Sequence, residues 1–400
     1  MNILKMRILI INIILFVNTF LMLGQNSCDT LPLIRCDENL IHNIQEENLR
    51  PLIDKFQNIK SEKHEPIRIV HIGDSHLQAG FITEKIKQEL FQRFSQDTIA
   101  SPGFVFPYTI AQTNNPFFYN LNYKGDWDWC KNVDFEKTCR LGLSGITVRT
   151  KDSLSSIQLK MENEKYNDPI NYYFNRIRIL HSSNPISIKV NGIEANTQDG
   201  TSVIQLNNIT DSISVEIKNP LKGEFFELYG IILENEASKI NYHTIGVNGA
   251  TAQSYLKCDY FSRHLMTIDP DLVILSLGTN EAFNKDFNPI EHEYVLKDLI
   301  LQIKDVTPDT DIILTIPNDH FKNGKSNINV ESVRENIIKI AKEFNLSYWD
   351  FYTIMGSQAS MEKWHEKGLT GDDKIHFKKK GYAIQGELFA RALINLIDNF

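Results

Sequence analysis

The sequence predicts an α/β domain built on a parallel sheet, with an antiparallel β-sandwich inserted into it. Short, fully apolar runs such as Leu272–Leu277 alternate with amphipathic segments, which is typical of parallel strands covered by helices on both faces. Two strand–turn–helix units, around Ser75 and around Gly249, lie much farther apart than the ~30 residues that one βαβ unit needs. A separate domain is therefore expected between them.

The expected α/β elements fall into two parts of the chain. In the first part, a helix over Glu46–Ile59 precedes a strand over Ile67–Ile72 and a helix over Phe81–Phe94. The second part repeats the same pattern. Its expected strands are Tyr242–Val247, Leu272–Leu277, Asp311–Ile316 and Tyr348–Phe351. One helix is expected after Asn248-Gly249-Ala250 through about Met266, and a second after Gly278-Thr279-Asn280 through Ile303. The last two expected helices are Val330–Phe344 and Lys379–Ile397.

The middle of the chain, from about residue 120 to 235, shows no long helical period. Short alternating runs are separated by turn residues such as Asn191-Gly192 and Asp199-Gly200, which indicates an antiparallel sandwich. We place this inserted sandwich at residues 115–238, between an N-terminal part (25–114) and a C-terminal part (239–400) of the α/β domain. The expected strands are Gly145–Arg149, Ile157–Met161, Ile177–Leu180, Ile186–Val190, Val203–Leu206, Ile213–Ile217 and Phe225–Leu233.

The first 24 residues have the layout of a secretory signal peptide. Lys5 and Arg7 precede an apolar run over Ile8–Leu23, and the small residue Gly24 follows. The run is shorter than the ~20 residues that span a bilayer, although an uncleaved anchor is the alternative. We therefore expect an exported protein, periplasmic or extracellular, that has no membrane contact after cleavage.

Charge and cysteine content narrow the class of protein further. Lys+Arg number 42 and Asp+Glu 50, a net charge of −8, so no nucleic-acid partner is expected. No Cys-x-x-Cys motif occurs, which argues against zinc-ribbon and thioredoxin-like proteins. In an exported chain the close pairs Cys28/Cys36 and Cys130/Cys139 are candidate disulfides, and Cys258 is expected to be a buried thiol.

Three polar or glycine signals follow expected strands. Ser75, in Gly73-Asp74-Ser75-His76, would project from a strand's carboxyl end, where open α/β sheets bind ligands; the alternative is a helix N-cap. Gly249 offers an N–H, and Asn280 a side-chain amide, that can donate to an oxyanion. A turn glycine and an Asn cap are their ordinary interpretations.

A fourth signal lies near the C-terminus. Asp373 stands three residues before His376, a spacing that lets a carboxylate orient an imidazole, which can then act as general base for a serine. The alternative is a solvated loop, because Lys378–Lys380 follow at once. Each of the four signals is weak singly, but their order along the chain is informative.

Gly-Asp-Ser, then Gly, then Gly-x-Asn, then Asp-x-x-His resembles the SGNH (GDSL-type) hydrolase family, over about residues 45–110 and 240–400. The resemblance implies a flavodoxin-like, three-layer α/β fold. It also implies that Ser75 is the nucleophile, His376 the base and Asp373 its orienting carboxylate. The N–H groups of Ser75 and Gly249 and the amide of Asn280 would form the oxyanion hole.

Two acidic positions bear on the match to the family pattern. The family's spacing selects Asp373 rather than its neighbour Asp372. Glu281 stands where many members have Asp, and we expect this departure to affect packing beside Asn280 rather than the donor itself.

The form Gly-Asp-Ser-His, with a predicted export signal and a β-rich insertion, is most similar to peptidoglycan O-acetylesterases, which pair an SGNH domain with a carbohydrate-binding-like sandwich. We therefore expect a serine esterase that removes O-acetyl groups from peptidoglycan or another polysaccharide, without cofactor or metal. A lipase or arylesterase, an O-acetyltransferase of the same fold, and a non-catalytic glycan-binding protein remain alternatives. An aromatic run over residues 117–129 is expected to be core or domain interface more often than a sugar platform.

Overall fold

The computed structural model describes residues 27–42, 49–59, 65–95, 99–136, 138–163, 170–183, 186–221 and 223–400. The signal peptide predicted over residues 1–24 lies outside these ranges, as does the start of the helix predicted from residue 46. Within them, no helix combines the length and the apolar character needed to cross a membrane.

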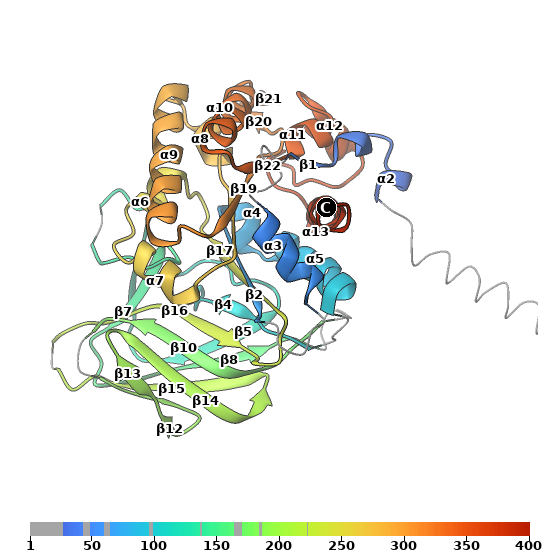
Figure 1. The fold of residues 1–400 in the computed structure, drawn as a ribbon. Coiled ribbons are helices and arrows are strands. Elements are labelled where there is room, and N and C mark those ends of the chain that lie inside the picture. The colour runs from blue at the N-terminus through green and yellow to red at the C-terminus, as the bar shows by residue number, and fades with distance from the viewer. Residues whose placement is uncertain are drawn as a thin grey trace, which may run out of the picture.

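The α/β domain is built on a six-stranded sheet (Figure 1). Counted from one edge, the parallel strands stand in the chain order second, first, third, fourth, fifth, which is the flavodoxin-type order. The predicted α/β, flavodoxin-like class is therefore confirmed. The strands in that spatial order are β17 (Ile240–Gly246), β2 (Ile67–Gly73), β18 (Leu272–Ser276), β19 (Asp311–Ile316) and β22 (Ser347–Asp350), with the short β1 (Ile41–His42) antiparallel to β22.

Helices cover both faces of this sheet in two groups (Figure 1). The helix expected from Gly249 to Met266 is divided at Cys258–Tyr260, because Tyr260 N–H donates to the Leu141 carbonyl and Asp259 accepts from Leu141 N–H. One group comprises α3 (Arg50–Gln57), α5 (Phe81–Leu90) and α13 (Lys379–Asp398), and the other α6 (Ala252–Leu256), α7 (Phe261–Ile268), α9 (Pro289–Val306) and α10 (Asn329–Phe344).

The inserted domain is a sandwich of two antiparallel sheets, as predicted. One sheet has the order β13-β14-β10-β16-β7-β6, with β4 also paired to β16, and the other has the order β12-β11-β15-β8-β5. Buried residues alternate with outward-facing ones along β8 and β15, since one face of each packs on the core. The strands are β4 (Gly103–Val105), β5 (Tyr119–Lys124), β6 (Asp128–Lys131), β7 (Ile146–Thr150), β8 (Leu154–Met161), β10 (Phe174–His181), β11 (Ser187–Val190), β12 (Ile193–Glu194), β13 (Asn196–Gln198), β14 (Thr201–Thr210), β15 (Ser212–Lys218) and β16 (Phe226–Glu234).

Sequence patterns missed the beginning of the sandwich. Strand β4 lies ahead of residue 115 and pairs with β16, so the larger sheet takes a strand from the segment assigned to the α/β domain. Of the aromatic run that follows, Phe118, Tyr119 and Trp127 are buried and Phe117 packs on Phe81, with ring centroids 4.8 Å apart. These aromatic residues therefore serve mainly as core.

The cysteines pair as the spacing suggested. Cys28–Cys36 and Cys130–Cys139 are disulfides, and Cys258 is a free, buried thiol. The second disulfide closes a loop of the sandwich, and Val133 within this loop lies 3.8 Å from the place that a Cβ on Gly249 would occupy. The sandwich therefore reaches the Gly249 loop of the α/β domain.

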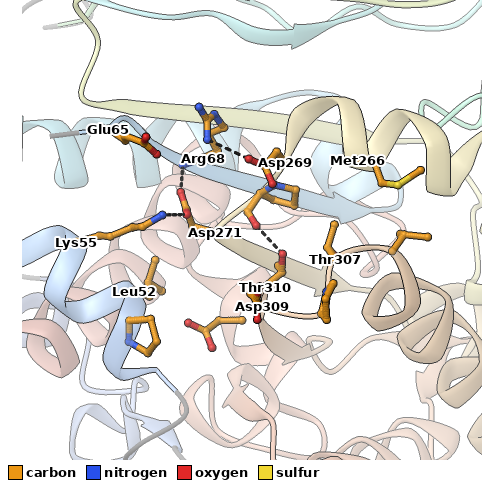
Figure 2. A pocket seen from close by; sticks show the side chains of 15 residues that line it. Leu52, Lys55, Glu65, Arg68, Met266, Asp269, Asp271, Thr307, Asp309 and Thr310 are labelled. Atoms are coloured by element: carbon orange, nitrogen blue, oxygen red, sulfur yellow. Dashed lines mark hydrogen bonds and ion pairs between the residues drawn. The ribbon is translucent and has the colours of Figure 1, made fainter.

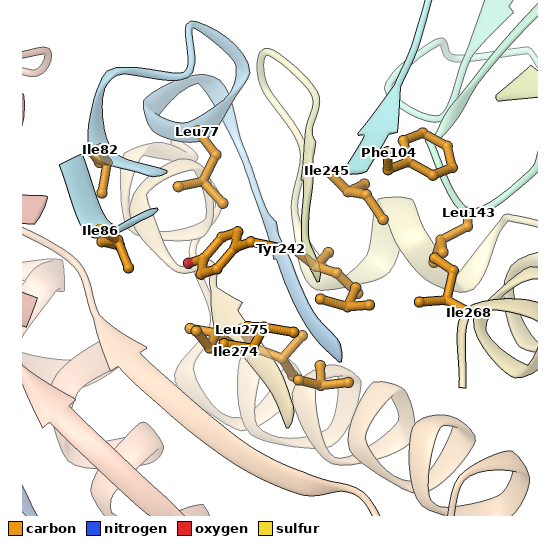
Figure 3. Close-up of a cluster of buried hydrophobic side chains, with 14 of the residues drawn as sticks. Leu77, Ile82, Ile86, Phe104, Leu143, Tyr242, Ile245, Ile268, Ile274 and Leu275 are labelled. Carbon is orange, nitrogen blue, oxygen red and sulfur yellow. The ribbon is translucent and has the colours of Figure 1, made fainter. Parts of the chain in front are cut away.

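A buried ion pair and an apolar cluster join the two domains. Lys87 of α5 is 1% exposed, and its Nζ lies 2.8 Å from Glu84 Oε1. Glu84 also accepts a hydrogen bond from Tyr172 OH, and the Lys87 ammonium lies 5.1 Å from the centre of the Tyr172 ring. Phe104 and Leu143 of the inserted segment belong to the same apolar cluster as Ile245 and Ile268 of the α/β domain (Figure 3).

The amino ends of the parallel strands border a charged pocket of about 340 Å³ (Figure 2). Asp271 pairs with Lys55 and accepts a hydrogen bond of 2.8 Å from the Arg68 N–H, while the Arg68 guanidinium lies 3.5 Å from Asp269. Arg68 is the second residue of β2, so the pocket lies at the opposite end of the sheet from Ser75. Its ion pairs tie α3 to the strands.

A polar row runs through the buried sheet. His71 Nδ1 lies 2.7 Å from Tyr242 OH and its Nε2 lies 2.6 Å from Ser276 Oγ, which accepts from Thr315 Oγ1 at 2.7 Å. The row thereby links β17, β2, β18 and β19. Burial lowers the pKa of His71 to about 3, because the apolar surroundings disfavour the charged ring.

This depressed pKa predicts acid sensitivity. An unfolded histidine takes up a proton below pH ~6.5, whereas His71 in the folded state stays neutral to about pH 3. The free energy of unfolding therefore falls as pH drops from 6.5 toward 3, by at most ~1.4 kcal/mol per pH unit for one such group. Urea unfolding at pH 7.5, 6 and 5 should show a shallower fall for His71→Gln than for the wild type. Identical pH dependence in the two proteins would contradict this assignment.

Candidate active site

The predicted site residues meet at the carboxyl end of the parallel sheet. Ser75 opens the short helix α4 (Ser75–Gln78) directly after β2, and Asp74 caps it by accepting a 2.9 Å hydrogen bond from His76 N–H. Gly249 follows β17, and Asn280 is the second residue of α8 (Thr279–Phe283) after β18. This edge includes the point between β2 and β18 where the strand order reverses, the usual ligand position in open α/β sheets.

Ser75, His376 and Asp373 form one hydrogen-bonded chain. Ser75 Oγ lies 2.8 Å from His376 Nε2, and His376 Nδ1 lies 2.7 Å from Asp373 Oδ2. The Asp373 carboxylate accepts a hydrogen bond from His376 Nδ1–H. When the imidazole is neutral, its Nε2 is therefore unprotonated and faces the Ser75 hydroxyl. The arrangement can move a proton from the serine hydroxyl to the histidine.

The loop that carries Asp373 holds it in position. Asp373 Oδ1 accepts hydrogen bonds from the N–H groups of Ile375 (2.9 Å) and His376 (3.0 Å), which leaves Oδ2 for the His376 ring. Partial burial alone would raise the pKa of Asp373, but the hydrogen bonds from His376 and Ile375 outweigh it and the pKa lies below its ordinary value. The carboxylate stays ionised and orients the ring. Its neighbour Asp372 is exposed.

Three donors converge beside the serine. Gly249 has φ +82°, a left-handed conformation that favours glycine. Within the described ranges, the N–H groups of Ser75 and Gly249 donate to no other protein group. Asn280 Nδ2 donates to the Ala250 carbonyl at 2.9 Å and makes a longer contact, 3.3 Å, with Asp74 Oδ2. Both bonds fix the amide, and the longer one to Asp74 is the bond that an oxyanion would have to replace.

Buried tyrosines fix the strand ends that carry these donors. Tyr255 OH donates to the Gly73 carbonyl at 2.6 Å, and Tyr108 OH donates to the Gly246 carbonyl at 3.1 Å. A Cβ on Gly246 would lie 2.6 Å from the backbone nitrogen of Gln78, so glycine is required for this close approach. The start of α4 and the Gly249 loop are thereby held against each other.

Gln78 links three segments of the site, and sequence reasoning missed it. Its side chain is buried, its Oε1 accepts from Asn248 N–H at 2.8 Å, and its Nε2 donates to Thr113 Oγ1 and the Asn114 carbonyl at 2.8 and 2.9 Å. The peptide that precedes Gly249 is therefore fixed by the helix that begins at Ser75. The three-residue spacing from Ser75 within one helix was the available signal.

His76 belongs to the Gly-Asp-Ser-His motif, but the sequence assigned it no role in the site. Its ring stacks on that of His376, with centroids 5.0 Å apart, and its Nδ1 lies 3.1 Å from Tyr382 OH. Burial and the neighbouring His376 charge lower the pKa of His76 well below its ordinary value. A neutral ring therefore supports His376 without opposing its protonation.

Two further carboxyl groups lie against the site. Burial raises the pKa of Asp74 to about 6, although the His76 N–H and the His376 charge favour the ionised form. Glu281 Oε1 accepts a 2.8 Å hydrogen bond from Ala252 N–H at the start of α6, and burial raises its pKa to about 7. Glu281 thus packs α8 against α6 and makes its hydrogen bond to Ala252 rather than to the Asn280 amide. In the described part of the chain, no group of three or more His, Cys, Asp or Glu side chains could hold a metal ion.

Comparisons with known proteins agree with this geometry. Residues 227–384 match the GDSL-like Lipase/Acylhydrolase family, a segment that includes Gly249, Asn280, Asp373 and His376. The C-terminal part of the α/β domain is therefore similar to that family of ester-hydrolysing enzymes, and the flavodoxin-like sheet has the SGNH (GDSL-type) hydrolase fold. No functionally curated protein matches the sequence.

The fold of the whole chain is similar to that of a peptidoglycan O-acetylesterase. The TM-score is 0.75 at 23% identity, over 90% of this chain and 99% of the other. A lipase/acylhydrolase from Enterococcus faecalis (TM-score 0.33, 18% identity) covers 40% of this chain and 77% of its own. An acetylxylan esterase from Geobacillus stearothermophilus (TM-score 0.32, 20% identity) covers 40% and 72%. The predicted resemblance to peptidoglycan O-acetylesterases, sandwich included, is confirmed at the level of fold.

Replacing Gln78 tests its role in positioning the Gly249 loop. Gln78→Leu removes the bonds to Asn248 and Thr113, and kcat on a small acetyl ester should fall by up to ~10²-fold, the usual consequence of a displacement near 1 Å. KM should change little. Thr113→Val, which keeps the Gln78–Asn248 bond, is the matched control and should lose far less. A folded Gln78→Leu protein with wild-type kcat would refute this role.

Removing the Asn280 amide tests the third donor. Asn280→Ala should lower kcat by ~10²–10³ with little change in KM, because the hydrogen bond to the oxyanion forms only in the transition state. Asn122→Ala, which removes an exposed amide from the sandwich strand β5, should leave both constants unchanged. If Asn280→Ala changed KM alone, the amide would instead bind ground-state substrate.

Proposed function

We propose that the protein is an exported serine esterase that removes O-acetyl groups from peptidoglycan or another polysaccharide. The observation that carries this proposal is the unbroken chain Ser75–His376–Asp373, with links of 2.8 and 2.7 Å, beside the N–H donors of the Gly249 loop. A glycan-binding protein without activity would have no use for this proton path.

In the proposed reaction, Ser75 Oγ attacks the acetyl carbonyl carbon while His376 Nε2 takes the hydroxyl proton. The N–H groups of Ser75 and Gly249 and the Asn280 amide stabilise the oxyanion. His376 then donates its proton to the sugar oxygen as the ester bond breaks, which leaves acetyl-Ser75 and a free sugar hydroxyl. Water, deprotonated by His376, releases acetate and restores the serine.

Two features support a polymeric, acetylated glycan as substrate. The fold likeness to a peptidoglycan O-acetylesterase extends over 90% of the chain, the sandwich included. The inserted segment also borders the site, because Asn248 Nδ2 donates to Asn114 Oδ1 at 2.9 Å and Val133 lies beside Gly249. A wall beside the oxyanion donors suits a substrate larger than a simple ester.

Export belongs to the same proposal. The signal-peptide layout of residues 1–24 and the disulfides Cys28–Cys36 and Cys130–Cys139 both suit an oxidising compartment, where an enzyme would meet the cell wall or external polysaccharide. Cell fractionation with an antibody against the chain tests this part.

Acetate release from O-acetylated peptidoglycan, compared with acetylated xylan and a longer-chain ester, tests the activity and ranks the substrates. Ser75→Ala should abolish hydrolysis while the melting temperature stays unchanged, and His376→Ala should lose a comparable factor because triad members act as a unit. Asp373→Asn should lower kcat much more than its matched control Asp372→Asn does. Full activity in Ser75→Ala would end the serine-esterase proposal.

A further inference from the structure

A hollow of about 230 Å³ is lined by residues that follow the Gly249 and Asn280 donors in the chain, among them Thr251 and Glu281. We propose that it is a subsite for one uncharged sugar ring of the glycan, next to the acetylated residue; this inference rests on the proposed function above. Its walls are Thr251 and Gln253 at the start of α6, Glu281 of α8, and Phe287 and Asn288 ahead of α9.

Its position follows from the chain. Thr251 comes two residues after Gly249, and Glu281 comes directly after Asn280. A substrate whose ester carbonyl lies between the Gly249 and Asn280 donors therefore has this hollow beside it. The hydrogen bond from Ala252 N–H to Glu281 Oε1 ties the two walls together at 2.8 Å, so the hollow is preformed relative to the donors.

Its surface offers the groups that bind a hydroxyl-bearing ring. Gln253 is exposed, and Asn288 uses its Oδ1 to cap α9. Among the described residues, neither the Gln253 amide nor the Asn288 NH₂ group has a hydrogen-bond partner, so both can bind a hydroxyl. Phe287 is partly exposed and its ring packs 6.1 Å from that of His292, which fixes an aromatic face in the wall. A few directed amides around an apolar face are typical of a specific small-ligand pocket.

The charges select the kind of sugar. The ionised side chains that line the hollow are Asp286 and Glu291, because burial raises the pKa of Glu281 to about 7. The exposed Lys285 lies 3.8 Å from Asp286 but is not among the lining residues, which include no lysine or arginine in the described part of the chain. His292 does not offset them, because burial lowers its pKa to about 4 and the ring is neutral at working pH. A ring that bears a free carboxylate is repelled here, so the bound ring is uncharged, for example a hexose or an N-acetylhexosamine.

Binding to the Ser75→Ala protein measures the subsite without any hydrolysis. The two ligands are an O-acetylated tetramer of N-acetylglucosamine and an O-acetylated tetramer of galacturonic acid. Isothermal titration calorimetry measures the dissociation constant of each. The neutral tetramer should bind more tightly. Adding Gln253→Ala or Phe287→Leu should weaken its binding by ~3- to 10-fold, the effect of one lost hydrogen bond or ring contact.

Gln158→Ala is the matched control, because Gln158 is an amide in a separate hollow on the outer face of the sandwich. It should leave binding unchanged, and none of the three substitutions should alter hydrolysis of 4-nitrophenyl acetate when Ser75 is present. Three results would each overturn the subsite. The neutral tetramer could bind the Gln253→Ala variant as tightly as its parent, its binding could be weakened by Gln158→Ala instead, or the galacturonic acid tetramer could bind more tightly than the neutral one. If the proposed function itself is wrong, the wild-type protein releases no acetate from the O-acetylated substrates.

Discussion

The site depends on the register of three parallel strands. Gly73 at the end of β2 is the register partner of Gly246 on β17 and of Ser276 on β18. The segments that carry Ser75, Gly249 and Asn280 therefore leave the sheet at one level, and short turns suffice to bring a nucleophile and its oxyanion donors together. Asp373 and His376 come from a distant loop, but they need only meet a serine whose position the sheet has already set.

Strand β18 was predictable because it is a short apolar run that ends in a polar residue, and β19 begins and ends where the pattern placed it. The order of the four motifs predicted which strand ends meet. The start of the sandwich could not be predicted in the same way, since β4 is a three-residue strand that gains its place only by pairing with β16.

The residues that hold the site in place, His76 and Gln78, could not be predicted for a different reason. His76 and Gln78 lie next to the serine in sequence, yet their partners, Tyr382 and Asn248, lie in other segments of the chain. Only the folded chain shows that one buried amide fixes the peptide before Gly249. Such residues carry no pattern of their own, because their role consists of hydrogen bonds between distant segments.

The place of the insertion has a consequence for how the chain folds. Strand β2 pairs with β17 and β18 alone among the described strands, and both are synthesised after the whole sandwich. Until then the apolar run Ile67–Ile72 has no partner. The central sheet thus closes late, through contacts of long sequence separation, after all strands of the sandwich have been synthesised. In a chain assembled in this order, the edge of the sheet that carries Ser75, Gly249 and Asn280 forms last.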